Sequence, residues 1–483
     1  MHGGTEVGMK IELRELFTCL DPFEIYTVFK DEKNTAFLDS SRDFDTLGRY
    51  SFIGLNTFLV LKEEEGKCYV NGSLSALNAF EKLEVLLKEF FVEYPFEIPF
   101  PAGCIGYISY DAGLGLDKVY VISEEGFSLP EVYFVFYDNL ILMDNLTGKY
   151  YVSACGMLDS PGKSIDGIFN RIHSGENAKR TRENQNDGQE TAIPESAASL
   201  ARPGDTGEYD PFQGFQSNFT RKQYEDAVAR MKEYIRSGDI YIANMTQRFS
   251  KVTDRNSFAI YKKLREINPA PFAAYLSFEG FEVISCSPER FMRINQRMVE
   301  TRPIKGTRPR GGTPEEDEAN RLQLQQSEKD RAELLMIVDL ERNDLSRVCK
   351  PGTVKVTELF KLEEYSTVFH LVSTVTGELK DGTGALQCIK TCFPGGSITG
   401  TPKVRAMEII DELEGIKRSL YTGCIGYFSL NGNADFNIVI RTLLKKGRDV
   451  CFGVGGGITW DSVESDEYME TLDKARAFFR AFA

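Results

Sequence analysis

The residue best placed to do covalent chemistry is Lys305, within the segment TRPIKGTRPR (301–310). An amine attacks as a nucleophile only in its neutral form. Nearby positive charge and partial desolvation both disfavour an ammonium group, and Arg302, Arg308 and Arg310 lie close to Lys305 along the chain. The segment therefore predicts either a nucleophilic lysine or a basic loop that only holds an anion, and spacing alone does not separate the two.

Two predicted helices each carry a pair of carboxylates that could hold a divalent cation. Asp330 and Glu333 are three residues apart, and Glu467 and Glu470 repeat this spacing, with Lys474 four residues later. Residues three or four apart share one helix face. Mg²⁺ binds few protein carboxylates together with waters and substrate oxygens, so the pattern favours a magnesium cage. The alternative is a solvated acidic face with an ordinary glutamate–lysine pair.

Two glycine-rich segments could bring backbone close to a ligand. FPGGSITG (393–400), which contains Ser397, leads into a predicted helix, and exposed N–H groups at a helix start can seat an anion. GVGGGI (453–458) also permits close approach, but it lacks the βαβ context of a dinucleotide-binding fingerprint. Arg441, which ends the strand-like FNIVIR, could bind a carboxylate through two hydrogen bonds.

Composition is that of an acidic, soluble protein. The 483 residues carry a net charge of −15, which argues against a nucleic-acid partner and means that local cations or a metal must attract an anionic substrate. Ten scattered cysteines and only three histidines argue against a zinc site. No signal peptide or long apolar stretch is found. We expect a cytoplasmic protein with reduced thiols and no membrane segment.

The elements that must position these groups follow from periodicity. Residues 11–173 are predicted to be mainly strands with a few helices, and 174–215 is polar, nearly free of aromatics and read as a linker or surface loop. Residues 216–483 interleave strands with amphipathic helices. This alternation favours an α+β fold. The segment GCIGYIS (103–109) recurs as GCIGYFS (423–429).

Helix and hairpin boundaries carry local signals. Thr220 and Gln223 form a capping-box pattern, Ser327 could cap a helix running to about 340, and Pro402 suits the first turn of a helix ending near Gly415. A last helix is expected over about 465–482. A hairpin is predicted around 431–433, between strands 423–430 and 434–444.

Several long segments, in this order, resemble the chorismate-utilising enzymes, a family that includes anthranilate synthase component I, aminodeoxychorismate synthase component I, isochorismate synthase and salicylate synthase. The matching segments are CSPERF (286–291), TRPIKGTRPRG (301–311), KDRAELLMIVDLERNDL (329–345), VFHLVSTVTG (368–377), FPGGSITGTPKVRAMEIIDELE (393–414), GYFSLNGNADFNIVIRT (426–442) and GVGGGITWDSVESDEYMETLDKARA (453–477). The resemblance implies a large antiparallel β-sandwich with helices packed on the outside. It also implies an N-terminal domain over 11–173 and a chorismate-binding catalytic domain over 216–483.

The resemblance also implies roles for individual residues. Lys305 would attack C2 of chorismate, with Glu289 as the general acid and His370 beside the ring. Mg²⁺ would bind Glu333 and Glu470, with Asp330 and Glu467 assisting through water. The substrate would be held by Thr307, Ser397, Tyr421, Arg441, Gly455, Gly456, Gly457 and Lys474.

Within the family, the residue at position 305 separates two activities. Aminodeoxychorismate synthases resemble this chain in reading P-I-K-G-T, whereas anthranilate synthases usually read P-I-A-G-T. Isochorismate and salicylate synthases place a water-activating lysine where this chain has Ile242. The resemblance is therefore to aminodeoxychorismate synthase component I, with anthranilate synthase component I as the alternative. A non-catalytic binding protein is disfavoured because it would have no need of Lys305 or Glu289.

Two further ligands follow from the resemblance. The chain offers no cysteine–histidine arrangement that would release ammonia from glutamine, so a separate glutamine amidotransferase subunit is implied. The family's tryptophan pocket matches Ser40, Arg49, Tyr50, Ser51, Phe52, Pro271, Phe272 and Ala273. In some members this pocket mediates feedback, and in others it holds L-tryptophan structurally. The inhibitory serine motif reads L-L-E-S there, whereas this chain reads FLDS (37–40).

Overall fold

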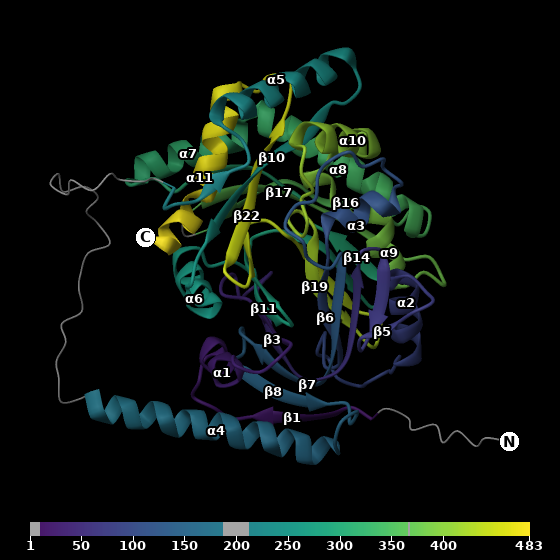
Figure 1. Ribbon diagram of the computed structural model, residues 1–483, viewed down its shortest axis with the longest axis vertical. Helices are drawn as coiled ribbons and strands as arrows, with labels where there is room; N and C mark the ends of the chain where they lie inside the picture. Colours follow the sequence, from purple (N-terminus) through teal and green to yellow (C-terminus); the bar gives the residue numbers. More distant parts are fainter. Residues whose placement is uncertain (1–9, 187–211, 366–367) are drawn as a thin grey trace.

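The computed structural model describes residues 10–186, 212–365 and 368–483. Helices surround two wings of antiparallel strands that face each other (Figure 1). The predicted α+β class is therefore confirmed. Every strand pair with a register in the described residues is antiparallel, including the pair formed by the two longest strands, β3 (Tyr50–Glu64) and β7 (Val132–Asp144).

Strands β3 and β7 belong to both wings. One wing continues from β3 through β2 (Thr35–Asp39), β11 (Phe272–Phe278), β12 (Phe281–Ser287), β21 (Thr442–Lys446), β22 (Asp449–Ile458) and β10 (Ile242–Val252). The other continues from β7 through β6 (Gly103–Ile108), β19 (Cys424–Ser429), β20 (Ala434–Ile438), β13 (Arg290–Asn295), β14 (Met298–Thr301) and β17 (Val368–Glu378), which also pairs with β15 (Ile304–Pro309) and β16 (Lys355–Glu364).

Short strands complete the edges. They are β8 (Lys149–Ala154) against β7, β1 (Glu12–Leu16) against β8, β4 (Lys67–Val70) against β3, β5 (Ser73–Leu74) against β4, and both β9 (Gln216–Ser217) and β18 (Gly400–Thr401) against β10.

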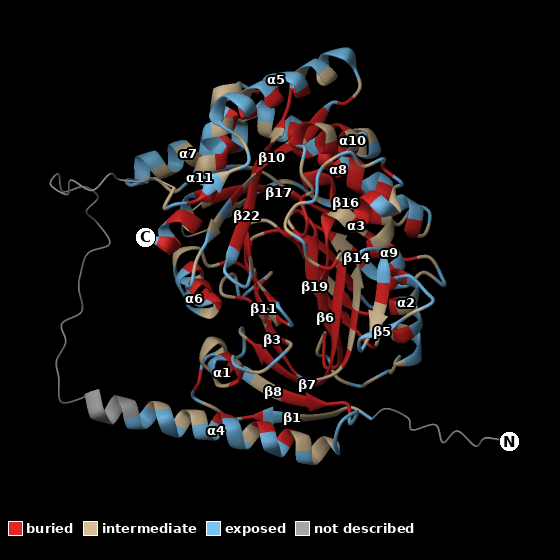
Figure 2. Ribbon diagram, viewed as in Figure 1, coloured by how far each residue is buried: buried red, intermediate tan, exposed pale blue. Residues whose placement is uncertain are grey.

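The helices cover the outer faces of the wings. They are α1 (Pro22–Phe29), α2 (Ala79–Glu89), α3 (Tyr110–Leu116), α4 (Pro161–Asn186), α5 (Arg221–Ser237), α6 (Ser257–Ile267), α7 (Pro314–Gln326), α8 (Glu328–Val348), α9 (Ala385–Cys392), the 3₁₀ turn η1 (Gly396–Ile398), α10 (Lys403–Glu414) and α11 (Glu464–Phe482). Figure 2 shows buried residues concentrated in the strands and on the inner helix faces.

Strand β7 shows how the layers are built. All of its residues are buried. Successive side chains of a strand point to opposite faces: Tyr133 and Val135 join an apolar cluster with residues of β11 and β12, whereas Phe134 and Phe136 join a second cluster with residues of α2, α8 and α9. The wings therefore pack on each other through one face and on helices through the other, which confirms the predicted sandwich arrangement.

The local signals in the sequence hold at most boundaries. Thr220 and Gln223 form the capping box of α5, the Ser327 hydroxyl accepts from the Asp330 N–H at the start of α8, and Gly415 ends α10 with φ 67°. A residue without a Cβ tolerates that left-handed conformation best. The predicted strand 434–444 is interrupted: β20 ends at Ile438 and β21 begins at Thr442.

The predicted linker is wrong over residues 174–186, which continue helix α4. The polar composition of this segment did not indicate a helix. Earlier in α4, the buried Ile165, Ile168 and Ile172 share a core with β8 and α1. Beyond them, the Glu176 carboxylate accepts from the Cys19 backbone N–H at 2.8 Å. Residues 187–211 lie outside the described residues. The predicted domains of residues 11–173 and 216–483 share hydrogen-bonded strands, β2 with β11 and β6 with β19.

The repeated GCIGY segments are neighbours in space. Strand β6 pairs antiparallel with β19, and Gly106 lies opposite Gly426. At each position a Cβ would come within 3 Å of a phenylalanine, Phe134 for Gly106 and Phe436 for Gly426. A Cβ would come still closer, 2.0 Å, to the carbonyl oxygens of Tyr133 and Asp435, so both glycines of this local two-fold contact give room to the backbone of the neighbouring strand.

Candidate active site

Lys305 lies where the ends of the two wings meet. Its Nζ is 3.3 Å from the Ser397 carbonyl oxygen in η1, to which it donates a hydrogen bond. A Cβ placed on Gly457 of β22 would lie 3.2 Å from the same Nζ. The backbone of both glycine-rich segments therefore approaches the amine, and any side chain at position 457 would displace it.

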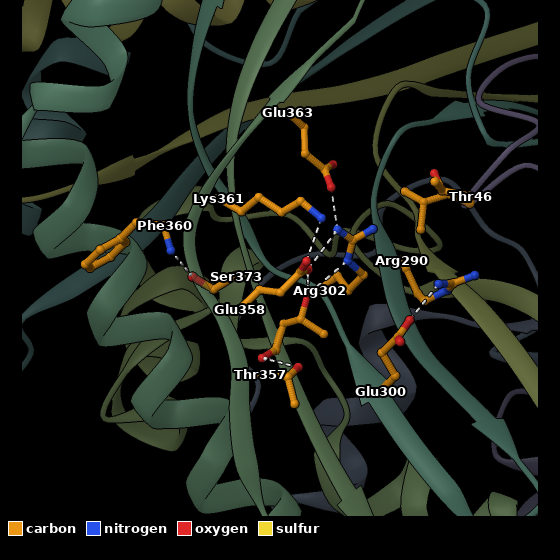
Figure 3. Close-up of polar contacts among 12 residues, drawn as sticks. Thr46, Arg290, Glu300, Arg302, Thr357, Glu358, Phe360, Lys361, Glu363 and Ser373 are labelled. Atoms are coloured by element: carbon orange, nitrogen blue, oxygen red, sulfur yellow. Dashed lines mark hydrogen bonds and ion pairs between the residues drawn. The ribbon is translucent and has the colours of Figure 1, made fainter.

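The arginines close to Lys305 in sequence do not act on it as unpaired cations. Figure 3 shows Arg302 with the carboxylates of Glu363 and Glu358. Arg308 donates to Asp330 at 3.0 Å, and Arg310 forms an ion pair with Asp317. Each of the three arginines therefore has a carboxylate partner of its own, which their proximity to Lys305 along the chain did not indicate.

Glu289 is a buried acid beside Lys305. Burial raises the pKa of its carboxyl, and the nearby Ser397 hydroxyl, the charge of Lys305 and the Ile304 backbone N–H oppose that rise. Its own carbonyl accepts from the Ile438 N–H at 3.0 Å, which ties it to the end of β20. A carboxyl whose pKa is raised by burial is suited to give a proton to a leaving group.

The predicted carboxylates converge from α8 and α11. Burial raises the pKa of Glu333, and the negative charges of Asp330 and Glu467 raise it further. Burial likewise raises the pKa of Glu467 with help from Glu470. For Glu470 burial raises the pKa, but Lys474, 2.7 Å away, outweighs it and leaves the pKa lowered. Carboxylates that raise one another's pKa mark a place that a cation would stabilise.

Gly456 opens the space in front of two of these carboxylates. A Cβ on Gly456 would lie 3.2 Å from Glu467 Oε2 and 3.3 Å from Glu470 Oε1. Within the described residues, no group of three or more potential ligands stands close enough to bind a metal by itself. Mg²⁺ usually takes one or two carboxylates and completes its shell with water and substrate, so Glu333 and Glu470 fit that ion. Asp330 is engaged by Arg308.

A second group of predicted residues surrounds His370. The Thr307 hydroxyl is 2.9 Å from His370 Nδ1, because β15 and β17 bring the two residues opposite each other. Burial, followed by the positive charge of Arg441, lowers the pKa of His370 to about 4. A pKa of about 4 leaves the imidazole of His370 neutral at physiological pH, with one ring nitrogen at hydrogen-bond distance from Thr307.

Arg441 is a half-buried cation without a carboxylate partner among the described residues. Its Nη1 donates to Asn268 Oδ1 at 3.1 Å, and no ion pair to it is found. Burial lowers its pKa. An isolated buried charge is costly unless something pairs with it. The site therefore offers a guanidinium that an anionic ligand would stabilise.

Comparison with known proteins shows which family has this arrangement of residues. The profile of the chorismate-binding enzymes matches residues 34–480. Anthranilate synthase component 1 of Aquifex aeolicus is 37% identical over 472 residues, which cover 95% of this chain and 92% of that protein. Aminodeoxychorismate synthase component 1 of Bacillus subtilis is also 37% identical, over 457 residues that cover 94% of this chain and 92% of that protein.

The chain belongs to the chorismate-binding enzymes. The crystal structure of anthranilate synthase component I from Streptococcus pneumoniae has a TM-score of 0.75 and 30% identity, and the match covers 89% of this chain and 92% of that one. This protein is thus a chorismate-utilising enzyme of the anthranilate synthase or aminodeoxychorismate synthase type. The two named relatives are equally similar to it, so the comparisons do not separate these activities.

Other predicted residues of this chorismate-binding enzyme lie around the same centre. Lys474 donates to the Gly455 carbonyl at 2.7 Å. Ile242 lies against Gly457, the same glycine that contacts Lys305. Tyr421 lies against Gly453, beside the buried Arg418–Glu414 ion pair. No described contact joins Tyr421 to Lys305.

The predicted tryptophan pocket coincides with a cavity of about 600 Å³. The predicted residues that line it are Ser40, Arg49, Tyr50, Phe52, Pro271, Phe272 and Ala273. Ser51 does not line the cavity, because its hydroxyl is turned to the Ser40 backbone N–H at 3.1 Å and to Asn145. The Ser40 hydroxyl lies 2.8 Å from the Tyr50 carbonyl and 2.9 Å from the Pro271 carbonyl.

Sequence reasoning missed two buried acids. Glu341 lies eight residues after Glu333 on α8, two turns further along the same face, and that spacing could have revealed it. Glu414 forms an ion pair with Arg418, which also donates to the carbonyls of Asn244 and Ile398. The pair joins β10 to η1 behind the site. Its partners come from three separate segments, so no local pattern predicts it.

The expectations about membrane segments and thiols can also be compared with the structure. No helix in the described part of the chain is long and apolar enough to cross a membrane. All ten cysteines are free thiols, and Cys19 is the exposed one.

Proposed function

We propose that this chain is the chorismate-converting component of an aminodeoxychorismate synthase of folate and para-aminobenzoate biosynthesis. The observation that carries the proposal is Lys305, whose amine lies between Ser397 and Gly457 and beside Glu289. Anthranilate formation needs no amine from the protein here, and the family's anthranilate synthases usually carry alanine at this position. The substrates would be chorismate and ammonia.

The proposed reaction proceeds in two displacements. The Lys305 nitrogen forms a bond to C2 of chorismate, the two conjugated ring double bonds shift to C1–C6 and C4–C5, and the C4 hydroxyl leaves as water with a proton from Glu289. The Glu289 carboxylate then takes the surplus proton from the lysine nitrogen. Ammonia bonds to C4, the C2–nitrogen bond breaks, and Glu289 passes its proton back to neutralise the departing amine. The new C4 ammonium then returns one proton to the Glu289 carboxylate, so the sum is chorismate and ammonia giving 4-amino-4-deoxychorismate and water.

Mg²⁺ bound by Glu333 and Glu470 would supply a positive charge for the ring carboxylate, which favours attack at the adjacent C2. The protein's own groups do the rest. Arg441 would bind the enolpyruvyl carboxylate with two hydrogen bonds, and the Gly455–Gly457 backbone leaves room for it. Neutral His370, held by Thr307, would contact the ring. Lys474 would balance the charge of Glu470 before substrate arrives.

Ammonia would come from a separate glutamine amidotransferase subunit. The proposal is supported by the cysteines of this chain: nine of the ten are buried, and burial raises the pKa of thiols such as Cys286 and Cys451. A glutamine-cleaving thiol must be accessible and activated. The remaining Cys19 is exposed, and its backbone N–H donates to the Glu176 carboxylate.

Anthranilate synthase component I is the second candidate, because a relative of that name is as similar as the aminodeoxychorismate synthase. Incubation of the purified chain with chorismate, Mg²⁺ and an ammonium salt separates the two. We expect 4-amino-4-deoxychorismate by chromatography and mass, and no pyruvate. Fluorescent anthranilate with stoichiometric pyruvate would establish the second candidate instead. A reaction without ammonium is the control.

A further inference from the structure

Glu341 of α8 is a buried acid that the proposed reaction does not use. Its stem packs under η1: a Cβ on Gly396 would lie 3.7 Å from Glu341 Cγ. No cation forms an ion pair with it among the described residues. The charged groups that act on it are Glu289, Asp344 and Lys403, and Lys403 is itself paired with Asp344.

Hydrogen-bond geometry assigns its protonation state. The Thr301 hydroxyl oxygen is 2.8 Å from the Phe291 carbonyl and 3.0 Å from Glu341 Oε2. A hydroxyl has one hydrogen to give, and a carbonyl or an ionised carboxylate can only accept. With Glu341 ionised, one of the two oxygen–oxygen contacts has no hydrogen. With Glu341 protonated, Glu341 donates to Thr301 and Thr301 donates to Phe291.

The electrostatic surroundings agree with this assignment. An ionised carboxylate buried without a cation is strongly disfavoured. Burial raises the pKa of Glu341 to about 8, the negative charges of Glu289 and Asp344 add to that rise, and Thr301 and Lys403 oppose it.

We infer that Glu341 is a protonated carboxylic acid whose hydrogen positions the catalytic strands. The chain from Glu341 to Thr301 to the Phe291 carbonyl links α8 to β14 and β13. Thr301 is four residues before Lys305, and Phe291 is two residues after Glu289. When Glu341 loses its proton, the Thr301 hydroxyl turns its hydrogen toward the carboxylate, and the hydrogen bond to the Phe291 carbonyl is lost. The ionised Glu341 also places a second negative charge near Glu289. Glu341 is therefore a positioning residue with an alkaline limit.

The variant Glu341→Gln tests the inference, because an amide also donates a hydrogen to Thr301 and does not ionise. The kcat for chorismate conversion is measured from pH 6.5 to 9.5 for both proteins, and their ratio is taken at each pH so that ionisation of ammonia and Lys305 cancels. Above the pKa of an essential acid, activity falls about tenfold per pH unit. We expect the ratio of variant to wild type to rise at least about fivefold between pH 7.5 and 9.5, because the wild type alone loses activity at about tenfold per pH unit above the pKa. A constant ratio overturns the inference.

A stability measurement tests the protonation state without any substrate, so it is informative even if the protein makes anthranilate. The folded-state pKa of Glu341 is raised above that of an unfolded glutamate. Its stabilising contribution is therefore present at low pH and is lost as pH rises through about 8. The wild type should lose unfolding free energy relative to Glu341→Gln between pH 5 and 8. A difference independent of pH would show that Glu341 is ionised throughout.

The positioning role requires one more comparison. Glu341→Ala should lower kcat at neutral pH about tenfold more than Glu341→Gln does, with similar KM for chorismate, because it removes the donated hydrogen bond. Equal kcat in the two variants overturns this role. If the alanine variant does not fold, Thr301→Val and Thr301→Ser make the same comparison, since only serine keeps the hydroxyl. The exposed Glu328→Gln on α8 is the control for helix charge.

Discussion

The Lys305 site and the Ser40 cavity are both lined by charged residues, but they differ in how those charges are balanced. In the cavity, Arg49 pairs with Asp144, and Arg290 pairs with Asp435 and Glu300. Near Lys305, the half-buried Arg441 has no described carboxylate partner. Burial raises the pKa of both Glu333 and Glu467, and the charge of Glu467 adds to the rise for Glu333. The buried guanidinium of Arg290 in the cavity is therefore balanced by carboxylates, whereas the half-buried guanidinium of Arg441 near Lys305 is not.

This difference indicates what each region binds. Unpaired buried charges cost stability in the free protein, and they persist where a ligand or cation completes them. A doubly anionic substrate and Mg²⁺ fit the Lys305 site in this sense. The paired charges of the Ser40 cavity fit a ligand without net charge, such as a zwitterionic amino acid. The predictions below test the two halves of the contrast.

The largest effect is expected for Lys305→Ala. Removing a nucleophile lowers turnover on the order of 10³-fold or more, and the variant should leak anthranilate because its loop then reads P-I-A-G-T. With chorismate and no ammonia, the wild type should form a covalent adduct that peptide mapping places on Lys305. The control is Lys361→Ala, an exposed lysine paired with Glu358. An adduct on another residue, or full aminodeoxychorismate synthesis by Lys305→Ala, would restrict Lys305 to an electrostatic role.

Glu333→Gln and Glu470→Gln come next. Each removes one charge from the proposed Mg²⁺ shell, so turnover at saturating Mg²⁺ should fall on the order of 10²-fold while the fold is retained. Isothermal titration with Mg²⁺ in the presence of chorismate should show weakened binding. Asp473→Asn, which changes an exposed carboxylate of α11, is the matched control. Unchanged turnover and Mg²⁺ affinity in either glutamate variant would remove that residue from the metal site.

Much of the site could be predicted because its residues lie in long segments with local signals. The carboxylate pairs follow from helical spacing, and Gly455–Gly457 follow from their own composition. The partners of the arginines could not be predicted: Glu358 and Glu363 come from β16, and proximity along an extended chain does not determine which charges face each other. Glu341 and the Arg418–Glu414 pair were missed because their roles depend on contacts between distant segments. The end of helix α4, residues 174–186, was misread because it is polar on every side, and the isoleucines that anchor the helix lie before it.

Arg441→Gln should have a smaller effect that falls on binding. Losing a charge-assisted pair to a carboxylate costs about 1.5–3 kcal/mol, which corresponds to roughly a 10- to 100-fold rise in KM for chorismate. The kcat should change less, because Arg441 does not touch the reacting carbons. Arg448→Gln, an exposed arginine paired with Asp254, is the control. A fall in kcat with constant KM would contradict the assignment of Arg441 to substrate binding.

The smallest effect on turnover is expected for Ser40→Ala. This variant tests whether the Ser40 cavity functions independently of the Lys305 site. The variant loses a buried hydrogen bond to the Tyr50 or Pro271 carbonyl, so the free energy of unfolding should fall by about 1 kcal/mol. If the cavity holds tryptophan, calorimetry should show weaker binding, while ammonia-dependent turnover without tryptophan stays within about twofold, since no Ser40 contact reaches Lys305. Ser41→Ala is the matched control, because Ser41 bonds the neighbouring Ala270 backbone but does not line the cavity. Equal tryptophan affinities in the two variants would mean that the amino acid binds elsewhere. A large loss of turnover in Ser40→Ala alone would mean that the two regions are coupled even without a ligand.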